Sequence, residues 1–454
     1  MEDINKDDSA SPNANFVIVG AGLVGCLASV YLSKLGFKVN VYEYREDIRK
    51  NVQTRGKSIN LALSHRGLEA LKNADIALAD FTHMLVPMKG RMIHKRNANC
   101  EALMYDVKYQ RHIYSIGRNE LNKMLLNEAE KKGVKFNFRC KVVKVDFQKK
   151  ILNISQQSSN EDKPQEVKYD YLIGCDGAYS TIRHCMMRTP LFNFSQTYID
   201  HGYMELSIPV NAQQSEKNKM TPNHLHIWPR VTFMMIALPN EDGSWTVTLF
   251  MPFEQFGKIK NRHDLLDFFG QHFADALPLI GHQNLIETFF SSTPQPLVSI
   301  KCDKYTVGND CLIMGDAAHA VVPFFGQGMN AGFEDCQILY EILKHEPSSK
   351  AFESFSKKRI IDTHAISNLS MYNYLEMRNL VVSKRFLLLK KLDNMLYKYL
   401  WSEMWKPLYV HVTFSSTPYS RCLQIQKFQR QVLNAFGFAI VILLGLLVLG
   451  IKFS

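Results

Sequence analysis

The chain of 454 residues exceeds the roughly 100–200 residues of an ordinary domain, which excludes a lone small module and predicts two domains or one large, elaborated core. Hydrophobic residues make up 46% of the sequence and charged residues 21%, so the chain can bury a large core and carries too little charge to be disordered. The formal net charge of +11 favours an anionic partner, which composition leaves open as nucleic acid, a phospholipid surface or a phosphate-bearing cofactor.

The nine cysteines are scattered, without a C-x-x-C pair or a metal-ligand spacing, so buried free thiols in a reducing compartment are favoured over disulfides or zinc. The first 15 residues are acidic and polar. They lack the apolar segment of a signal peptide and the arginines of a transit peptide, which predicts a disordered N-terminus that stays in the cytosol.

The first element expected is a strand at 16–20, a short apolar run that ends in glycine. Helical periodicity follows up to Gly36, and a second strand is expected at 38–43. An amphipathic helix is predicted at 118–132 and a buried strand at 169–177. Strands separated by helices in this way predict an α/β domain.

The pattern changes at about residue 190. Three strand-like runs between there and residue 300 are separated by turns, which predicts an antiparallel sheet. A buried strand at 310–316, a helix at 329–344 and a largely helical region at 350–430 are expected to follow.

The segment 432–451 contains twenty residues without a charge, and as a helix it would span about 30 Å, the thickness of the hydrocarbon core of a bilayer. It therefore predicts a C-terminal transmembrane anchor, over the alternative of a buried core helix, which would normally show a polar stripe. Residues 383–430 carry nine Lys or Arg and two Asp or Glu residues, a net charge of +7 beside the apolar tail. This position favours an anionic lipid surface over nucleic acid.

Gly20, Gly22 and Gly25 form a G-x-G-x-x-G motif between the first strand and the first helix, and Glu43 ends the next strand. The first glycine permits a tight turn, the second lets a pyrophosphate approach the backbone, and the third lets helix and strand pack closely. The acidic residue is placed to accept ribose hydroxyls. This context predicts dinucleotide binding and leaves NAD(P) and FAD open.

Two later motifs bear on that choice. Asp176-Gly177 and Gly315-Asp316 each close an apolar strand, where open α/β sheets bind ligands, although either pair alone would be an ordinary turn. The second leads into a glycine-rich helix start near Gly328. A helix N-terminus there would stabilise negative charge on a reduced flavin.

These motifs, in this order, resemble those of the single-component, FAD-dependent aromatic hydroxylases. Within that family, longer blocks are similar to the members that hydroxylate L-kynurenine, at 54–67, 201–209, 226–230, 315–336 and 370–378. The resemblance extends from about residue 16 to the predicted anchor. It implies an α/β fold with an FAD-binding Rossmann-like domain, an interleaved antiparallel-sheet substrate domain, a C-terminal helical region and the transmembrane helix.

The predicted parts of the chain interleave. The FAD-binding domain is expected to be discontinuous, at 16–75, 110–185 and 300–350. The substrate domain is expected at 76–109 and 186–299, the helical cap region at 351–430 and the anchor at 432–451.

The resemblance also implies the residues of two sites. Those expected to hold FAD are Gly20, Gly22, Val24, Gly25, Tyr42, Glu43, Tyr44, Arg45, Ala62, Arg118, Val142, Asp176, Asp316, Met329 and Asn330. The carboxylate of L-kynurenine is expected to contact Arg91 and Tyr105, with Asn373 and Tyr409 closing the pocket. Arg91 lies in an apolar run, where a guanidinium fork suits a carboxylate, but an ordinary surface-strand arginine stays an open alternative.

The implied activity is hydroxylation of L-kynurenine to 3-hydroxykynurenine in tryptophan catabolism. NADPH would reduce FAD, and dioxygen would then form a flavin C4a-hydroperoxide that transfers oxygen to the ring. The flavin carries this chemistry, so no catalytic side chain and no metal are expected, and His319 and Cys175 are interpreted as structural. The resemblance implies the mitochondrial outer membrane as location, with the endoplasmic reticulum as alternative. A flavin hydroxylase or epoxidase acting on a quinone or lipid, and a non-catalytic flavin-fold scaffold, are the competing interpretations.

Overall fold

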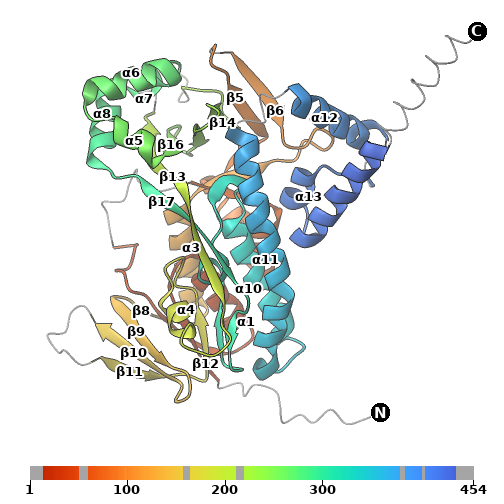
Figure 1. Ribbon diagram of the computed structural model, residues 1–454. Coiled ribbons are helices and arrows are strands. Elements are labelled where there is room, and N and C mark those ends of the chain that lie inside the picture. The colour runs from red at the N-terminus through yellow and green to blue at the C-terminus, as the bar shows by residue number, and fades with distance from the viewer. Residues whose placement is uncertain are drawn as a thin grey trace, which may run out of the picture.

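The computed structural model describes residues 14–50, 60–97, 99–156, 164–210, 219–378, 384–400 and 404–435. Two large sheets dominate this part of the chain, one mostly parallel and one mostly antiparallel. The long helix α11 (Ser348–Arg378) contacts elements of both and runs along the molecule between them and the C-terminal helices (Figure 1).

The first sheet has six strands in the order β18-β19-β12-β1-β2-β8. Their bounds are Thr306–Val307, Cys311–Ile313, Tyr171–Gly174, Asn15–Val19, Lys38–Tyr42 and Lys135–Asn137. All neighbours pair parallel except β18 with β19. The central strand β1 is buried along nearly its whole length, as expected where helices cover both faces of a parallel sheet.

Three helices pack beside this sheet. Helix α1 (Leu23–Lys34) contacts both α3 (Arg118–Lys131) and α10 (Gly328–Leu343). Two three-stranded antiparallel sheets flank this region. One contains β9 (Cys140–Asp146), β10 (Ile151–Gln156) and β11 (Gln165–Lys168), and the other β3 (Asn60–Leu63), β7 (Ile113–Gly117) and β4 (Val86–Met88).

The second large sheet has seven strands in the order β17-β13-β16-β15-β14-β5-β6. Their bounds are Gln295–Cys302, Phe194–Ile208, Trp245–Pro252, Met234–Pro239, His224–Pro229, Gly90–His94 and Cys100–Met104. The pairs formed by β13 to β17 are antiparallel, as the sequence predicts, whereas β5 joins β14 in parallel. A segment near residue 90 therefore extends a sheet made mostly of residues 194–302.

Four helices stand where the sequence predicted only sheet between residues 190 and 300. They are α5 (Phe253–Lys258), α6 (Arg262–His272), α7 (Leu277–Ile280) and α8 (His282–Ser291), which lie together at one end of the molecule (Figure 1). Leu265 and Phe269 of α6 are buried one helical turn apart, and Asn261 caps its N-terminus by accepting hydrogen bonds from two backbone N–H groups. These signals outweigh the strand-rich character of the surrounding sequence.

The C-terminal region is helical, as predicted. It contains α12 (Lys384–Met395), a π-helical turn (Leu396–Leu400), α13 (Leu408–Phe414) and a further helix at 419–435. The predicted transmembrane helix at 432–451 lies outside the described residues from 436 onward. No helix in the described parts of the chain is long and apolar enough to cross a membrane. The predicted fold class is therefore corrected: the α/β fold is found, but the residues that the structure describes contain no helix that could be the predicted transmembrane one.

Candidate functional site

The glycine motif lies at the carboxyl end of β1. Gly20 has φ of +102°, and a Cβ atom there would approach the Cys175 carbonyl oxygen to 2.5 Å. A Cβ atom on Gly25 would lie only 1.9 Å from the Gly20 carbonyl oxygen, so α1 can begin this close to the strand only without a side chain at that position. A Cβ atom on Gly22, by contrast, would meet no described atom within 4 Å. The first turn of α1 therefore presents an open backbone surface suited to a pyrophosphate.

Glu43 connects the end of β2 to this turn. One of its carboxylate oxygens accepts the Ala21 N–H at 2.7 Å, and the other accepts the Arg45 N–H at 2.9 Å. The remaining lone pairs of the carboxylate can accept ribose hydroxyls. The neighbouring side chains, Tyr44 and Arg45, are exposed and Tyr42 is half-buried, so the adenosine-end residues lie together at the surface.

The two aspartate motifs end strands next to β1. Strand β12 pairs with both β1 and β19, so Gly20, Asp176 and Asp316 follow three adjacent parallel strands. Asp316 is exposed. One oxygen of Asp176 accepts the N–H groups of Thr181 and Ile182, while its Oδ1 is buried without a hydrogen-bond partner among the described residues. Burial raises the pKa of Asp176 above its usual value. An unsatisfied buried oxygen of this kind fits a ligand hydroxyl.

The start of α10 is tied to the end of β3 through Asn330, which is fully buried. Its Oδ1 accepts the Ser64 N–H at 2.9 Å, and its Nδ2 donates to the carbonyl oxygens of Ala62 and Gly326, both at 2.8 Å. The predicted FAD residues Ala62, Met329 and Asn330 are thereby brought together. Met329 itself is partly buried against the core of the first sheet.

The other predicted FAD residues have different surroundings. Val24 lies beside Gly315 and Gly332, where a Cβ atom on either glycine would come within 2.9 Å of its side chain. Arg118 is exposed at the start of α3, one turn before Asn122, whose Nδ2 donates to the Ala21 carbonyl oxygen. Val142 is 4% exposed and packs in the core cluster, so its side chain is held within the protein.

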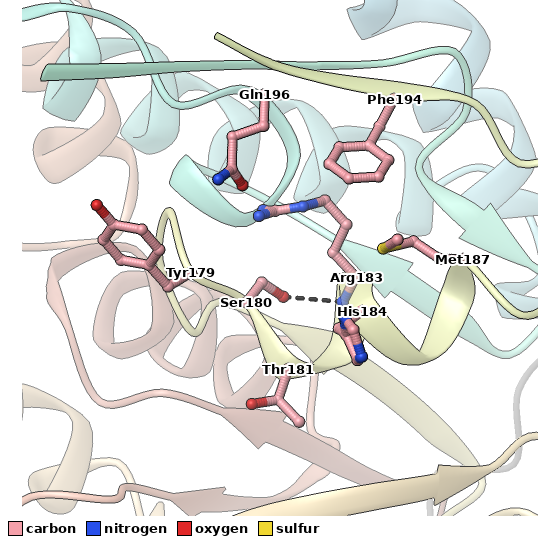
Figure 2. Close-up of a pocket in the computed structure, with 8 residues that line it drawn as sticks. All are labelled: Tyr179, Ser180, Thr181, Arg183, His184, Met187, Phe194 and Gln196. Carbon is pink, nitrogen blue, oxygen red and sulfur yellow. Dashed lines mark hydrogen bonds between the residues drawn. The ribbon is translucent and has the colours of Figure 1, made fainter. Parts of the chain in front are cut away.

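A surface pocket of about 330 Å³ lies beside the Asp-Gly motif (Figure 2). The buried Arg183, in the short helix α4 (Thr181–Met186), projects along it and donates to the carbonyl oxygens of Ala178 and Ala317. Arg183 thereby joins the loop after β12 to the short helix α9 (Asp316–His319). The two hydrogen bonds of Arg183 therefore fix the position of one aspartate motif relative to the other.

Three of the four predicted substrate residues meet directly. The rings of Tyr105 and Tyr409 stack at 5.0 Å, and the Arg91 guanidinium carbon lies 4.9 Å from the Tyr409 ring and 5.9 Å from the Tyr105 ring. Arg91 is only 4% exposed, which rules out a surface-strand arginine. Arg91 Nε and the Tyr105 hydroxyl are buried and lack hydrogen-bond partners within the described chain, a pair of orphan groups that fits a carboxylate ligand.

Asn373 lies on α11 and reaches this cluster through an aromatic pair. Its Nδ2 donates to the Phe324 carbonyl oxygen at 2.6 Å, and the next residue, Phe325, stacks on Tyr409 at 5.4 Å. Phe324 itself stacks on Tyr374 with ring centroids 3.9 Å apart. Residues Pro323–Phe325, just before α10, therefore separate the predicted substrate residues from the start of that helix.

Glu376 belongs to this site and was missed from the sequence. Its Oε1 lies 3.2 Å from Arg91 Nη1 and 3.6 Å from Lys390 Nζ. Burial by itself lowers the pKa of Arg91, but the attraction and hydrogen bond of Glu376, together with Tyr409 and Tyr105, outweigh it, so the pKa is raised. The sequence could have indicated Glu376, because it follows the predicted substrate residue Asn373 by three positions on one helix and therefore lies on the same helix face.

The reverse face of strand β5 is held by histidines. His94 and Arg91 are three residues apart on the strand and so point to opposite faces. His94 Nδ1 lies 2.7 Å from Asp275 Oδ2, and its Nε2 lies 2.8 Å from His226 Nδ1. His226 Nε2 donates to the Thr221 carbonyl oxygen at 2.8 Å. This chain joins the strand of Arg91 to the loop between α6 and α7.

Acid is expected to weaken this region. Burial lowers the pKa of His226 to about 4, against about 6.5 when unfolded. Between those values the unfolded state binds more protons, so stability is complete above pH 6.5 and falls, by up to about 3 kcal/mol, as the pH drops towards 4. His226→Gln should flatten the fall in melting temperature over this window, measured by thermal unfolding. His263→Gln, which changes an exposed histidine, should leave the fall unchanged; equal curves for all three proteins would contradict the assignment.

The chain is similar to known FAD-dependent proteins along most of its length. A family model described as an FAD binding domain matches residues 13–360. The chain is 48% identical over 420 residues to kynurenine 3-monooxygenase of Anopheles gambiae, covering 92% of this chain and 85% of that protein. It is 46% identical over 437 residues to kynurenine 3-monooxygenase of Sus scrofa, covering 95% and 90%.

Solved structures share the fold at lower identity. The tetrameric form of 2-methyl-3-hydroxypyridine-5-carboxylic acid oxygenase has a TM-score of 0.65 at 20% identity, covering 86% of this chain and 97% of its own. Tetracycline destructase Tet(51) has a TM-score of 0.61 at 16% identity, covering 87% and 99%. These likenesses show the α/β fold alone.

Proposed function

Because the chain belongs to the kynurenine 3-monooxygenase family, we propose that it hydroxylates L-kynurenine to 3-hydroxykynurenine, using FAD with NADPH and dioxygen as co-substrates. The observation that carries this proposal is the buried Arg91 beside a stacked pair of tyrosine rings, with an Nε that has no hydrogen-bond partner in the described chain and the Glu376 carboxylate next to it. Such a site selects a small molecule that bears both a carboxylate and an ammonium group.

The residues of the first sheet fit FAD. The open first turn of α1 would bind the pyrophosphate of FAD, and Glu43 would bind the ribose. Asp176 and Asp316 would bind the hydroxylated chain between the pyrophosphate and the flavin ring. Bound FAD would supply the redox chemistry that activates dioxygen. The protein would supply position, charge and exclusion of water.

Arg91 and Glu376 would divide the amino-acid end of L-kynurenine between them. The substrate carboxylate would bind the guanidinium and the Tyr105 hydroxyl, since both groups have unused donors. The α-ammonium would bind Glu376. Because the carboxylate and ammonium share one carbon atom, two groups 3.2 Å apart can contact both.

An apolar wall would face the substrate ring. Phe250, Phe324, Tyr374 and Met377 belong to one buried cluster that lies next to Asn373. Such a wall orients an aromatic ring and excludes bulk water, which would otherwise divert activated oxygen to hydrogen peroxide. The aryl amine of kynurenine already donates electron density to its ring, so no protein base is required for the attack.

Product identification tests the proposal. The purified, FAD-loaded protein is expected to oxidise NADPH only when L-kynurenine is added and to form 3-hydroxykynurenine in equal amount, measured by absorbance and chromatography. A quinone substrate should give no product, because it offers Arg91 no carboxylate. FAD-loaded protein that forms no hydroxylated kynurenine would refute the proposal, and product from the quinone alone would favour the quinone-directed alternative.

A further inference from the structure

Residues 408–420 connect the substrate pocket to the segments expected at the flavin. Tyr409, at the start of α13, stacks against Tyr105 beside Arg91. Ten residues later, Tyr419 is fully buried against α2 (His65–Asn73) and the start of α10. One short stretch of chain therefore contacts both sites.

Tyr419 begins a directional chain of hydrogen bonds. Its hydroxyl donates to Gln327 Oε1 at 3.0 Å, and Gln327 Nε2 donates to Ser64 Oγ at 3.3 Å. The Ser64 N–H then donates to Asn330 Oδ1 at 2.9 Å. The backbone fixes the polarity of the last link, because an N–H can only donate. Gln327 is the N-cap residue of α10, and Asn330, the residue after Met329, lies in its first turn, so these hydrogen bonds set where that turn lies.

Arg66 fixes the ring of Tyr419. Its guanidinium carbon lies 3.9 Å from the ring centroid, and its side chain is fully buried. Arg66 also donates to the Thr417 carbonyl oxygen and pairs with Glu334 of α10. The Arg66 guanidinium therefore packs against the face of the Tyr419 ring, while the hydroxyl of Tyr419 points at Gln327.

The same ion network continues to the second aspartate motif. Arg359 pairs with Glu334 at 2.9 Å and with Asp335 at 2.8 Å. Asp335 Oδ2 accepts the N–H of Gly315, the residue before Asp316, at 3.1 Å. Two routes thus join residues 417–419 to backbone expected at FAD. One runs from Tyr419 through Gln327, and the other runs from Arg66 through Glu334 and Arg359 to Asp335.

From this arrangement we propose that Tyr419 is a positioning residue, which holds the first turn of α10 against the flavin and relays to it the state of the substrate pocket through residues 408–420. The inference rests on the proposed function for the identity of both ligands. It assigns Tyr419 no contact with either of them. A ligand bound beside Tyr409 would shift residues 408–420, which would change the hydrogen bond from Tyr419 to Gln327 and so the surroundings of the flavin.

Tyr419→Phe tests this role, since it removes the hydroxyl and keeps the ring on Arg66. Full-length apoprotein is titrated with FAD, and the holoprotein is titrated with L-kynurenine without NADPH while the flavin absorbance is recorded. The variant should bind FAD about tenfold more weakly, as expected for one lost buried hydrogen bond that leaves Gln327 unsatisfied. Its flavin spectrum should respond less to L-kynurenine at saturation.

Tyr305→Phe is the matched control. Tyr305 is also fully buried, and its hydroxyl contacts Thr363 of α11. This control should lose comparable thermal stability but keep the wild-type FAD affinity and spectral response. Equal behaviour of the two variants in both titrations would overturn the proposal. If Tyr419→Phe does not fold, Ser64→Ala, which removes the far acceptor of Gln327, decides in its place by the same two readouts. A protein whose flavin responds as expected but which forms no 3-hydroxykynurenine would count against the proposed function alone.

Discussion

Arg91→Ala is expected to raise the KM for L-kynurenine by about 100-fold while FAD remains bound. Arg91 is 4% exposed, and its Nε, like the Tyr105 hydroxyl, has no hydrogen-bond partner in the described part of the chain. Truncating one partner of a buried, hydrogen-bonded charge pair costs about 2–5 kcal/mol, which corresponds to a loss of roughly 30-fold to several thousand-fold, a range that includes this value. The variant also leaves Glu376 without its arginine, which adds repulsion for the substrate carboxylate. Steady-state kinetics and the flavin-to-protein absorbance ratio measure the two effects separately.

Two further variants make this result interpretable. Arg91→Lys keeps the charge but removes the fork, so it should recover only part of the lost affinity. Arg262→Ala, on the exposed surface of α6, should behave as wild type. A loss of FAD from Arg91→Ala would show that the arginine supports the flavin site instead of the substrate carboxylate.

Gly25→Ala and Gly22→Ala are expected to fail in different ways. The added methyl at residue 25 would lie 1.9 Å from the Gly20 carbonyl oxygen, so α1 must move away from β1. We expect lower thermal stability of the apoprotein, by about 1–3 kcal/mol as for overpacked cores, and loss of FAD. The methyl at residue 22 meets no described atom of the protein within 4 Å, so only the FAD pyrophosphate would be obstructed.

The two proteins are compared without and with FAD. Apo Gly22→Ala should melt within about one degree of the wild type and bind FAD at least tenfold more weakly, by fluorescence titration. Apo Gly25→Ala should melt lower than both. Normal FAD affinity in Gly22→Ala would mean that the pyrophosphate does not approach the first turn of α1.

Local patterns made the first sheet and its motifs predictable. The apolar run of β1, the glycine turn and Glu43 are contiguous or nearly so, and their spacing carries the geometry. The substrate residues came from resemblance, because Arg91 and Tyr409 lie on elements whose meeting depends on how two sheets and several helices pack. The contact of Arg66 was unpredictable for the same reason. Nothing in the local sequence around this arginine indicates that it packs on the buried ring of Tyr419, some 350 residues later. The helices α5–α8 were missed because their apolar residues also suit strands.

The parallel pairing of β5 with β14 and the contact between Arg91 and Tyr409 have a consequence for folding. Contacts that span more than 130 and more than 300 residues require closure of long loops, which slows folding and delays the contact until both partners exist. During synthesis, the segments that form the first sheet leave the ribosome well before Tyr409 does. The nascent chain can therefore complete a flavin-type sheet while its substrate pocket still lacks a wall, and the enzyme becomes competent only after Tyr409 has been synthesised and packed.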